Sequence, residues 1–321
     1  MNREPIIIVA GEPNSVFLEI FFKSLKTHRY KSPLIIITSK KLLQEQMRKL
    51  GFFFEIKVID KQFNEFKKLN NSKINLIDVK YEFNNCFEKI SNKSNSFIKE
   101  SFEIALQILK KNKFSKFING PISKKYFLGG KSLGITEYLA KKTNKNNKVA
   151  MLIFNKRFSV SPITTHLALK DVHKYISKQM IYTHIKLITE FYKINFKKKP
   201  KIAVTGLNPH CESNFKDSEE DTIILPAIKK LKSKNFRIEG PFPADTIFMQ
   251  EHLKKFDIIV GMYHDQVLTP MKALFGFDAI NITLGLPFVR VSPDHGPNSS
   301  MLGKNLSDPK SLIEALKFLD K

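Results

Sequence analysis

The sequence lacks several features that would assign a chain to a class at once. No apolar stretch approaches the 18 residues expected of a membrane-spanning helix, and residues 1–15 show no signal-peptide pattern, so we expect no membrane association. Two cysteines, Cys86 and Cys211, cannot form a disulfide framework, which favours the reducing cytoplasm. Neither a GxGxxG motif nor a P-loop is present, so any nucleotide must bind in another way.

Arginine is also scarce, although the chain is strongly basic. The net charge is +24, but six of the 54 basic residues are arginine and the lysines are scattered between periodic segments. No arginine-rich or aromatic-interleaved basic motif appears, which disfavours nucleic acid as a partner. A positive field would still attract anionic substrates such as phosphates and dinucleotides.

Short apolar runs alternate with longer amphipathic ones along the 321 residues, which are enough for two domains. This alternation predicts an α/β fold with largely parallel strands covered by helices on both faces. The stretch 61–75 is rich in Lys and Asn and indicates a surface connection. Helices are expected at 95–112, 170–195 and 309–320. Strands are expected at 5–11, 33–39, 54–60, 114–120, 148–154, 157–166, 201–210, 256–265 and 278–288.

Three of the eight histidines share one context. His166, His210 and His264 each end a strand-like run, and ligands of such folds bind at the carboxyl ends of strands. Three imidazoles with an open fourth position suit a catalytic divalent metal, zinc above all, whereas a structural role is the alternative for each residue taken alone. Cys211 could mimic a ligand, but a structural role is favoured. Surface positions are expected for His28, His173, His184 and His252.

Anion-binding candidates lie elsewhere in the chain. Thr136 stands near the start of the helix opened by "GITE", where a phosphate or carboxylate could bind, although an ordinary helix cap is an equal alternative. Arg290 lies between two proline-bearing turns and could make the bidentate contacts that lysine cannot. Lys272 follows His264 by eight residues, and Asn281 shares a strand face with Thr283.

The ordered motifs of the chain resemble those of the 4-hydroxythreonine-4-phosphate dehydrogenase family of pyridoxal phosphate biosynthesis. The similarity covers nearly the whole chain and is densest over residues 119–296. The motifs that carry it are "GPISK", "GITEYLA", "TTHLALKDV", "IAVTGLNPH", "GPFPADTIF", "MYHDQVLTPMK" and "INITLGLPFVRVSPDHG".

The resemblance implies a fold like that of isocitrate and isopropylmalate dehydrogenases, with two α/β/α domains and a cleft between them. Residues 1–130 and 275–321 would form a first, cofactor-side domain, and residues 131–274 a second domain with the metal site and the dimer contacts. A homodimer would build its active site at the subunit interface. The implied reaction is oxidation of 4-phosphohydroxy-L-threonine by NAD, followed by decarboxylation to 3-amino-2-oxopropyl phosphate.

The resemblance also assigns residues to roles. His166, His210 and His264 match the family's ligands to a divalent metal, with zinc expected first and magnesium, manganese or cobalt as alternatives. The substrate contacts are matched by Thr136, Lys272, Asn281 and Arg290. Asp245 and Lys272 are the expected catalytic residues, with Asp245 either a general base or a residue that orients a histidine. His295, Gly296 and Gly303 match the loop that holds the adenosine of NAD.

The chain departs from the family pattern at three places. Its first loop, residues 11–19, reads "GEPNSVFLE" and has lost two glycines. Ile135 replaces a histidine that contacts substrate, which leaves threonate or erythronate 4-phosphate as alternative substrates. The loop 294–303 reads "DHGPNSSMLG", so the choice between NAD and NADP stays open.

Overall fold

The computed structural model of the protein describes residues 3–62, 65–129, 134–146, 148–211, 217–276, 279–293 and 296–320. The chain divides into two compact units, Met1–Tyr138 with Pro287–Lys321 (unit 1) and Leu139–Leu286 (unit 2). These boundaries lie later in the chain than the domain boundaries expected near residues 130 and 275. Both units alternate strands with helices, which confirms the α/β class. No helix in the described ranges is both long and apolar enough to cross a membrane.

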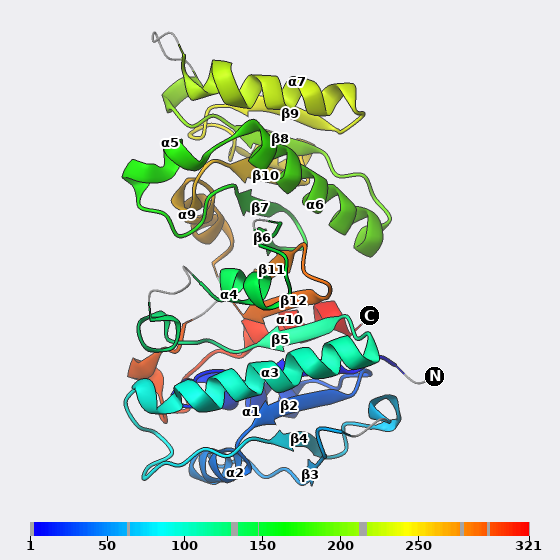
Figure 1. The fold of residues 1–321 in the computed structure, drawn as a ribbon, viewed down its shortest axis with the longest axis vertical. Helices are drawn as coiled ribbons and strands as arrows, with labels where there is room; N and C mark the ends of the chain where they lie inside the picture. The colour runs from blue at the N-terminus through cyan, green and yellow to red at the C-terminus, as the bar shows by residue number, and fades with distance from the viewer. Residues whose placement is uncertain are drawn as a thin grey trace. The chain divides into compact units, whose positions relative to one another are not determined.

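Unit 1 is built on parallel strands (Figure 1). Every residue of the runs "IIIV" and "LIIIT" is buried, as expected for strands covered on both faces. The order across the sheet is β3 (Ile56–Val58), β4 (Ile74–Asp78), β2 (Leu34–Thr38), β1 (Ile6–Val9), β5 (Lys116–Asn119) and β12 (Val289–Pro293).

Helices cover both faces of this sheet. The chain enters α2 through Ser39, whose Oγ accepts the Leu42 N–H at 3.3 Å and so caps the helix N-terminus. Figure 1 shows α3 crossing the near face of the strands, and α3 contacts β1 and β2 while α10 contacts β5 and β12. The helices are α1 (Phe17–Thr27), α2 (Lys40–Lys49), α3 (Asn95–Asn112), α10 (Lys310–Leu319) and the short η1 (Phe66–Lys68), η2 (Asn92–Ser94), η3 (Lys124–Leu128) and η7 (Ser299–Met301). Helix α4 (Ile135–Lys142) runs across the boundary between the units.

Unit 2 has a mixed sheet. Strand β6 runs antiparallel to both of its neighbours, whereas β7, β10, β8 and β9 run parallel to one another. The order is β11 (Ile280–Leu284), β6 (Ala150–Phe154), β7 (Ser159–Pro162), β10 (Ile258–Gly261), β8 (Ile202–Thr205) and β9 (Ile238–Phe242). The helices are α5 (Val172–Tyr175), α6 (Lys178–Phe196), α7 (Leu225–Ser233), α8 (Gln250–Lys255), α9 (His264–Phe275), η4 (Leu169–Asp171), η5 (Pro209–Cys211) and η6 (Glu220–Ile224).

The alternation of side chains along β7 separates two layers of unit 2. Val160 belongs to a buried apolar cluster with Val267 and Met271 of α9. Ser161, on the opposite face, contacts His184 of α6 at 2.6 Å. Helices α6 and α9 therefore cover opposite faces of the sheet, with α9 placed at the carboxyl end of β10.

Several sequence-based expectations were wrong in detail. The helix expected over 170–195 is broken, because Ser177 is extended and its Oγ caps α6 by accepting the Met180 N–H at 3.2 Å. The strand expected over 256–265 ends at Gly261, and a new helix begins at His264. Strands β4, β9 and β12 were missed, with β4 beginning inside the expected connection 61–75. His184 is 3% exposed rather than at the surface, because the helix turns it toward the sheet.

Candidate functional site

The carboxyl ends of neighbouring parallel strands in unit 2 carry the predicted metal ligands. His166 follows β7 and His264 follows β10, its direct neighbour. His210 and Asp245 follow β8 and β9, which continue the same parallel series. Ligands of open α/β sheets bind at this edge. The fold therefore brings to one edge four residues that lie far apart in the sequence.

His166 and His264 are close neighbours in space. Their ring centroids lie 6.1 Å apart with an angle of 35° between the ring planes. The Nδ1 atom of His264 lies 2.6 Å from the Asp265 carboxylate. An ionised carboxylate can only accept, so this contact places the ring proton on Nδ1 and leaves the Nε2 lone pair available to a metal. Both rings are partly buried, and this donor pair suits a divalent ion.

His210 lies at the same edge in a different setting. It sits in the short turn η5 with a positive φ of 58°, followed by Cys211 at 57°, and its side chain is exposed. Two successive non-glycine residues in the left-handed region are uncommon and often mark functional turns. Within the described ranges, no group of three or more His, Cys, Asp or Glu side chains is gathered closely enough to hold a metal. One chain thus brings two imidazoles together, with His210 on a neighbouring strand end.

A buried carboxylate holds the loop that carries His210. Glu220 Oε1 accepts the backbone N–H groups of Leu207 and Asn208 at 2.7 and 2.9 Å, and Oε2 accepts from the Asn208 side chain at 2.9 Å. Burial acts to raise the pKa of Glu220, but these hydrogen bonds outweigh it and lower the pKa below its ordinary value. No motif marked Glu220 in the sequence, because its partners belong to a loop that only the fold places beside it.

Unit 1 brings together two of the predicted substrate contacts. Arg290 Nη1 lies 3.5 Å from Thr136 Oγ1, and Arg290 Nε donates to the Asn119 side chain at 2.7 Å. Arg290, expected between two proline-bearing turns, lies on β12 and is 2% exposed. Burial lowers its pKa to about 10, and the nearby Glu137 carboxylate opposes this shift. Asn119, at the end of β5, had not been singled out from the sequence.

The remaining predicted contacts, Lys272 and Asn281, lie in unit 2. Lys272 is half-buried on α9, the helix that begins at His264. Asn281 lies on β11, and its Oδ1 is buried without a hydrogen-bond partner among the described residues. A buried amide oxygen without a donor is costly, and a substrate N–H or O–H group would satisfy it.

The predicted cofactor loop lies partly outside the described residues, because His295 does. Within the described part, the Pro297 carbonyl accepts the Val16 N–H at 3.2 Å. Gly303 has a φ of 75°, and a Cβ there would lie 3.0 Å from the Phe87 ring. The first loop and the cofactor loop, the two segments that depart from the family pattern, are therefore in direct contact in unit 1.

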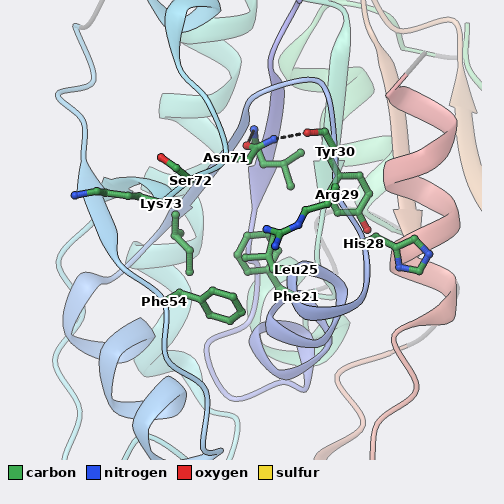
Figure 2. A pocket seen from close by; sticks show the side chains of 11 residues that line it. Phe21, Leu25, His28, Arg29, Tyr30, Phe54, Asn71, Ser72 and Lys73 are labelled. Atoms are coloured by element: carbon green, nitrogen blue, oxygen red, sulfur yellow. Dashed lines mark hydrogen bonds between the residues drawn. The ribbon is translucent and has the colours of Figure 1, made fainter.

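A separate pocket of about 100 Å³ lies at the amino ends of strands β2 and β4 of the unit 1 sheet (Figure 2). Its lining includes Leu34 and Ile74, the first residues of β2 and β4, together with Phe21 and Arg29. Asn71 closes one side by donating to the Tyr30 carbonyl at 2.9 Å (Figure 2). None of the predicted site residues lines this pocket, so it does not bear on the chemistry of the strand ends.

Comparisons with known proteins identify a family across the chain. A family model described as "Pyridoxal phosphate biosynthetic protein PdxA" matches residues 29–319. A 4-hydroxythreonine-4-phosphate dehydrogenase of Sulfurihydrogenibium sp. (strain YO3AOP1) is 38% identical over 318 residues, which cover 98% of this chain and 96% of the relative. A protein of Oceanobacillus iheyensis named "Putative D-threonate 4-phosphate dehydrogenase" is 32% identical over 328 residues, with 98% and 97% of the two chains covered.

Solved structures agree with this family. A 4-hydroxythreonine-4-phosphate dehydrogenase from Klebsiella pneumoniae superposes with a TM-score of 0.85 at 27% identity, over 99% of this chain and 97% of that one. An isocitrate dehydrogenase from Methylococcus capsulatus shares the fold alone, with a TM-score of 0.51 at 10% identity over 98% and 84% of the chains. The expected likeness to isocitrate dehydrogenases is confirmed at the level of the fold.

Proposed function

The chain belongs to the PdxA family of pyridoxal phosphate biosynthetic proteins, and we propose that it is a metal-dependent 4-hydroxythreonine-4-phosphate dehydrogenase. The overall reaction is oxidation of 4-phosphohydroxy-L-threonine by NAD to 2-amino-3-oxo-4-phosphooxybutanoate, which loses carbon dioxide to give 3-amino-2-oxopropyl phosphate. The observation that carries the proposal is the common sheet edge of His166, His210 and His264, in a chain with this family relation.

The proposed metal ligands are these three histidines. A divalent ion bound by imidazoles supplies a Lewis acid that lowers the pKa of a coordinated hydroxyl. His166 and His264 are adjacent in one chain, and we propose a homodimer in which two copies complete the donor set. Asp265 holds the His264 ring with Nε2 free to coordinate. Asp245 lies exposed in the turn after β9, at the same end of the sheet, where it is proposed to act as a general base or to orient a histidine.

Three side chains are proposed to bind the charged and polar groups of the substrate: Arg290, Lys272 and Asn281. Arg290 presents a guanidinium already oriented by Asn119, so little side-chain freedom is lost when it binds a phosphate or carboxylate. Lys272 supplies a second cation on α9, and Asn281 supplies the buried amide. NAD, when bound, accepts the hydride, and Gly296 and Gly303 belong to the loop proposed to hold it.

A direct assay tests the proposal. Purified protein is mixed with 4-phosphohydroxy-L-threonine, NAD and a divalent metal, and NADH is followed by its absorbance. We expect turnover that disappears after the metal is chelated and returns when Zn²⁺ or another divalent ion is added. Absence of NADH above the metal-free control would refute the proposed reaction.

A second substrate class is supported by a specific observation. Ile135 stands beside Thr136 where the family pattern has histidine, and one relative is named for D-threonate 4-phosphate. Parallel assays with threonate and erythronate 4-phosphates decide between the substrates by kcat/KM. Higher kcat/KM for either of these would assign the chain to that branch of the family.

A further inference from the structure

Gln266 takes no part in the function proposed above, yet its side chain joins two strand ends. It is the third residue of α9 and is 8% exposed. Its Oε1 accepts the Met262 N–H at 2.7 Å and the Thr205 hydroxyl at 2.9 Å, and its Nε2 donates to the Gly206 carbonyl at 2.8 Å. All three partners are buried, so water cannot replace these bonds if the amide is lost.

The same network extends to the loop after β7. The Met262 carbonyl accepts both the backbone N–H and the hydroxyl of Thr164, at 3.1 and 2.8 Å. Thr164 precedes His166 by two residues, and Met262 precedes His264 by two residues. Met262 therefore binds the segment before His166 through its backbone carbonyl, and Gln266 through its backbone N–H.

Gln266 is also bonded to the loop that leads to His210. Gly206, whose carbonyl Gln266 binds, opens the loop from β8 to η5. Close packing keeps Gln266 in place, because a Cβ at Gly261 would lie 2.4 Å from Val267 Cγ1 and 3.0 Å from Gln266 Oε1. Glycine at 261 thus allows α9 to fold back against the end of β10, where the amide meets its partners.

We propose that Gln266 is a positioning residue that holds the segments bearing His166, His210 and His264 in register for metal binding. This inference rests on the proposed function. The site needs an amide, because it must accept two hydrogen bonds and donate one. Glutamate could not donate to the Gly206 carbonyl, and methionine would leave the Met262 N–H, the Thr205 hydroxyl and that carbonyl without their partner.

The test measures metal affinity in the apo-protein rather than turnover. Zn²⁺ is titrated against a chromophoric chelator with wild type, Q266M, Q266E and a matched control, Q46M. Gln46 is also buried, at 1% exposure, and its Nε2 donates to the Pro13 and Cys86 carbonyls in unit 1, whereas the three histidines belong to unit 2. We expect Q266M and Q266E to weaken Zn²⁺ binding about 10- to 100-fold, as changes around metal ligands do, and Q46M to keep wild-type affinity.

The outcomes separate this inference from the proposed function. If H264A binds Zn²⁺ as tightly as wild type, the ligand assignment itself is wrong. If binding depends on His264 but folded Q266M retains wild-type affinity, or Q46M loses as much affinity as Q266M, the role of Gln266 is refuted. Should Q266M not fold, T205V removes one hydrogen bond to Oε1 without changing side-chain size, and unchanged affinity in T205V would equally refute it.

Discussion

The Nε2 atom of His184 lies 2.6 Å from the Ser161 hydroxyl in the interior of unit 2. Ser161 in turn donates to the Met151 carbonyl, so the histidine is fixed from α6 to the face of β7. Burial lowers the pKa of His184 to about 4. The imidazole is therefore neutral in the folded protein at pH values where an unfolded histidine would be charged.

This shift predicts an acid-sensitive unit 2. The folded pKa lies below the unfolded value of about 6.5, so the unfolded state binds the proton first. The stability contributed by neutral His184 is complete above pH 6.5 and is lost as the pH falls toward 4, by about 3 kcal/mol in total. Urea unfolding from pH 7 to 4 measures this loss. H184Q, which can still donate to Ser161 but cannot titrate, should show a smaller decrease over the same range, and an equal decrease would contradict the assignment.

Removal of the His264 imidazole should abolish turnover while the fold persists. His264 begins α9 at a strand end and is 36% exposed, so it contributes little to the core. NADH production by H264A should fall to background, with a circular dichroism spectrum and thermal midpoint close to wild type. H173A, which changes an exposed histidine of α5, is the control. Near-normal activity in H264A would exclude it as a metal ligand.

Replacement of Arg290 by lysine should weaken substrate binding. A lysine has a single ammonium group and no planar fork, so it cannot replace both the Nε bond to Asn119 and the bidentate contact with an anion. Hydrogen bonds to charged groups contribute about 1.5–3 kcal/mol each. We expect kcat/KM of R290K to fall roughly 10- to 100-fold, mainly through KM. Steady-state kinetics compare it with R237K, which alters an exposed arginine in unit 2. Equal kinetic constants in R290K and wild type would remove Arg290 from the substrate site.

Neutralisation of Glu220 should loosen the His210 loop. In E220Q one oxygen becomes an N–H donor, so the side chain can no longer accept from Leu207, Asn208 and the Asn208 amide together. The expected loss is about 1.5–3 kcal/mol of stability, with faster hydrogen exchange at the Leu207 and Asn208 amides. Because the pKa of Glu220 is lowered, wild type should lose this contribution only as the pH falls below the ordinary glutamate range. Unchanged exchange at both amides would show that the carboxylate does not hold the loop.

Much of the architecture could be predicted from local pattern. The period of "NSFIKESFEIALQILKKN" predicted α3 over the range at which it forms, and apolar runs predicted β1 and β2. Short strands whose partners are remote were missed: "VRVSP" lies between proline-bearing turns and was not predicted as a strand, yet pairing with β5 makes it β12. His184 was misplaced for a related reason, since which side of the amphipathic α6 its histidine occupies is decided only when the helix packs on the sheet.

The alternating strands and helices, the family motifs and the three histidines at strand ends could be recognised without the fold, because each of these depends on residues close together in the chain. Which strands become neighbours depends on long-range pairing and is visible only in the folded chain. The fold places His166 beside His264 and buries Arg290 next to Thr136 and Asn119. It also brings Glu220 to the loop that carries His210, and Gln266 to the Gly206 carbonyl that opens the same loop. A buried polar side chain acquires its role from partners that only the folded chain supplies, since each of its hydrogen bonds must be met inside the protein.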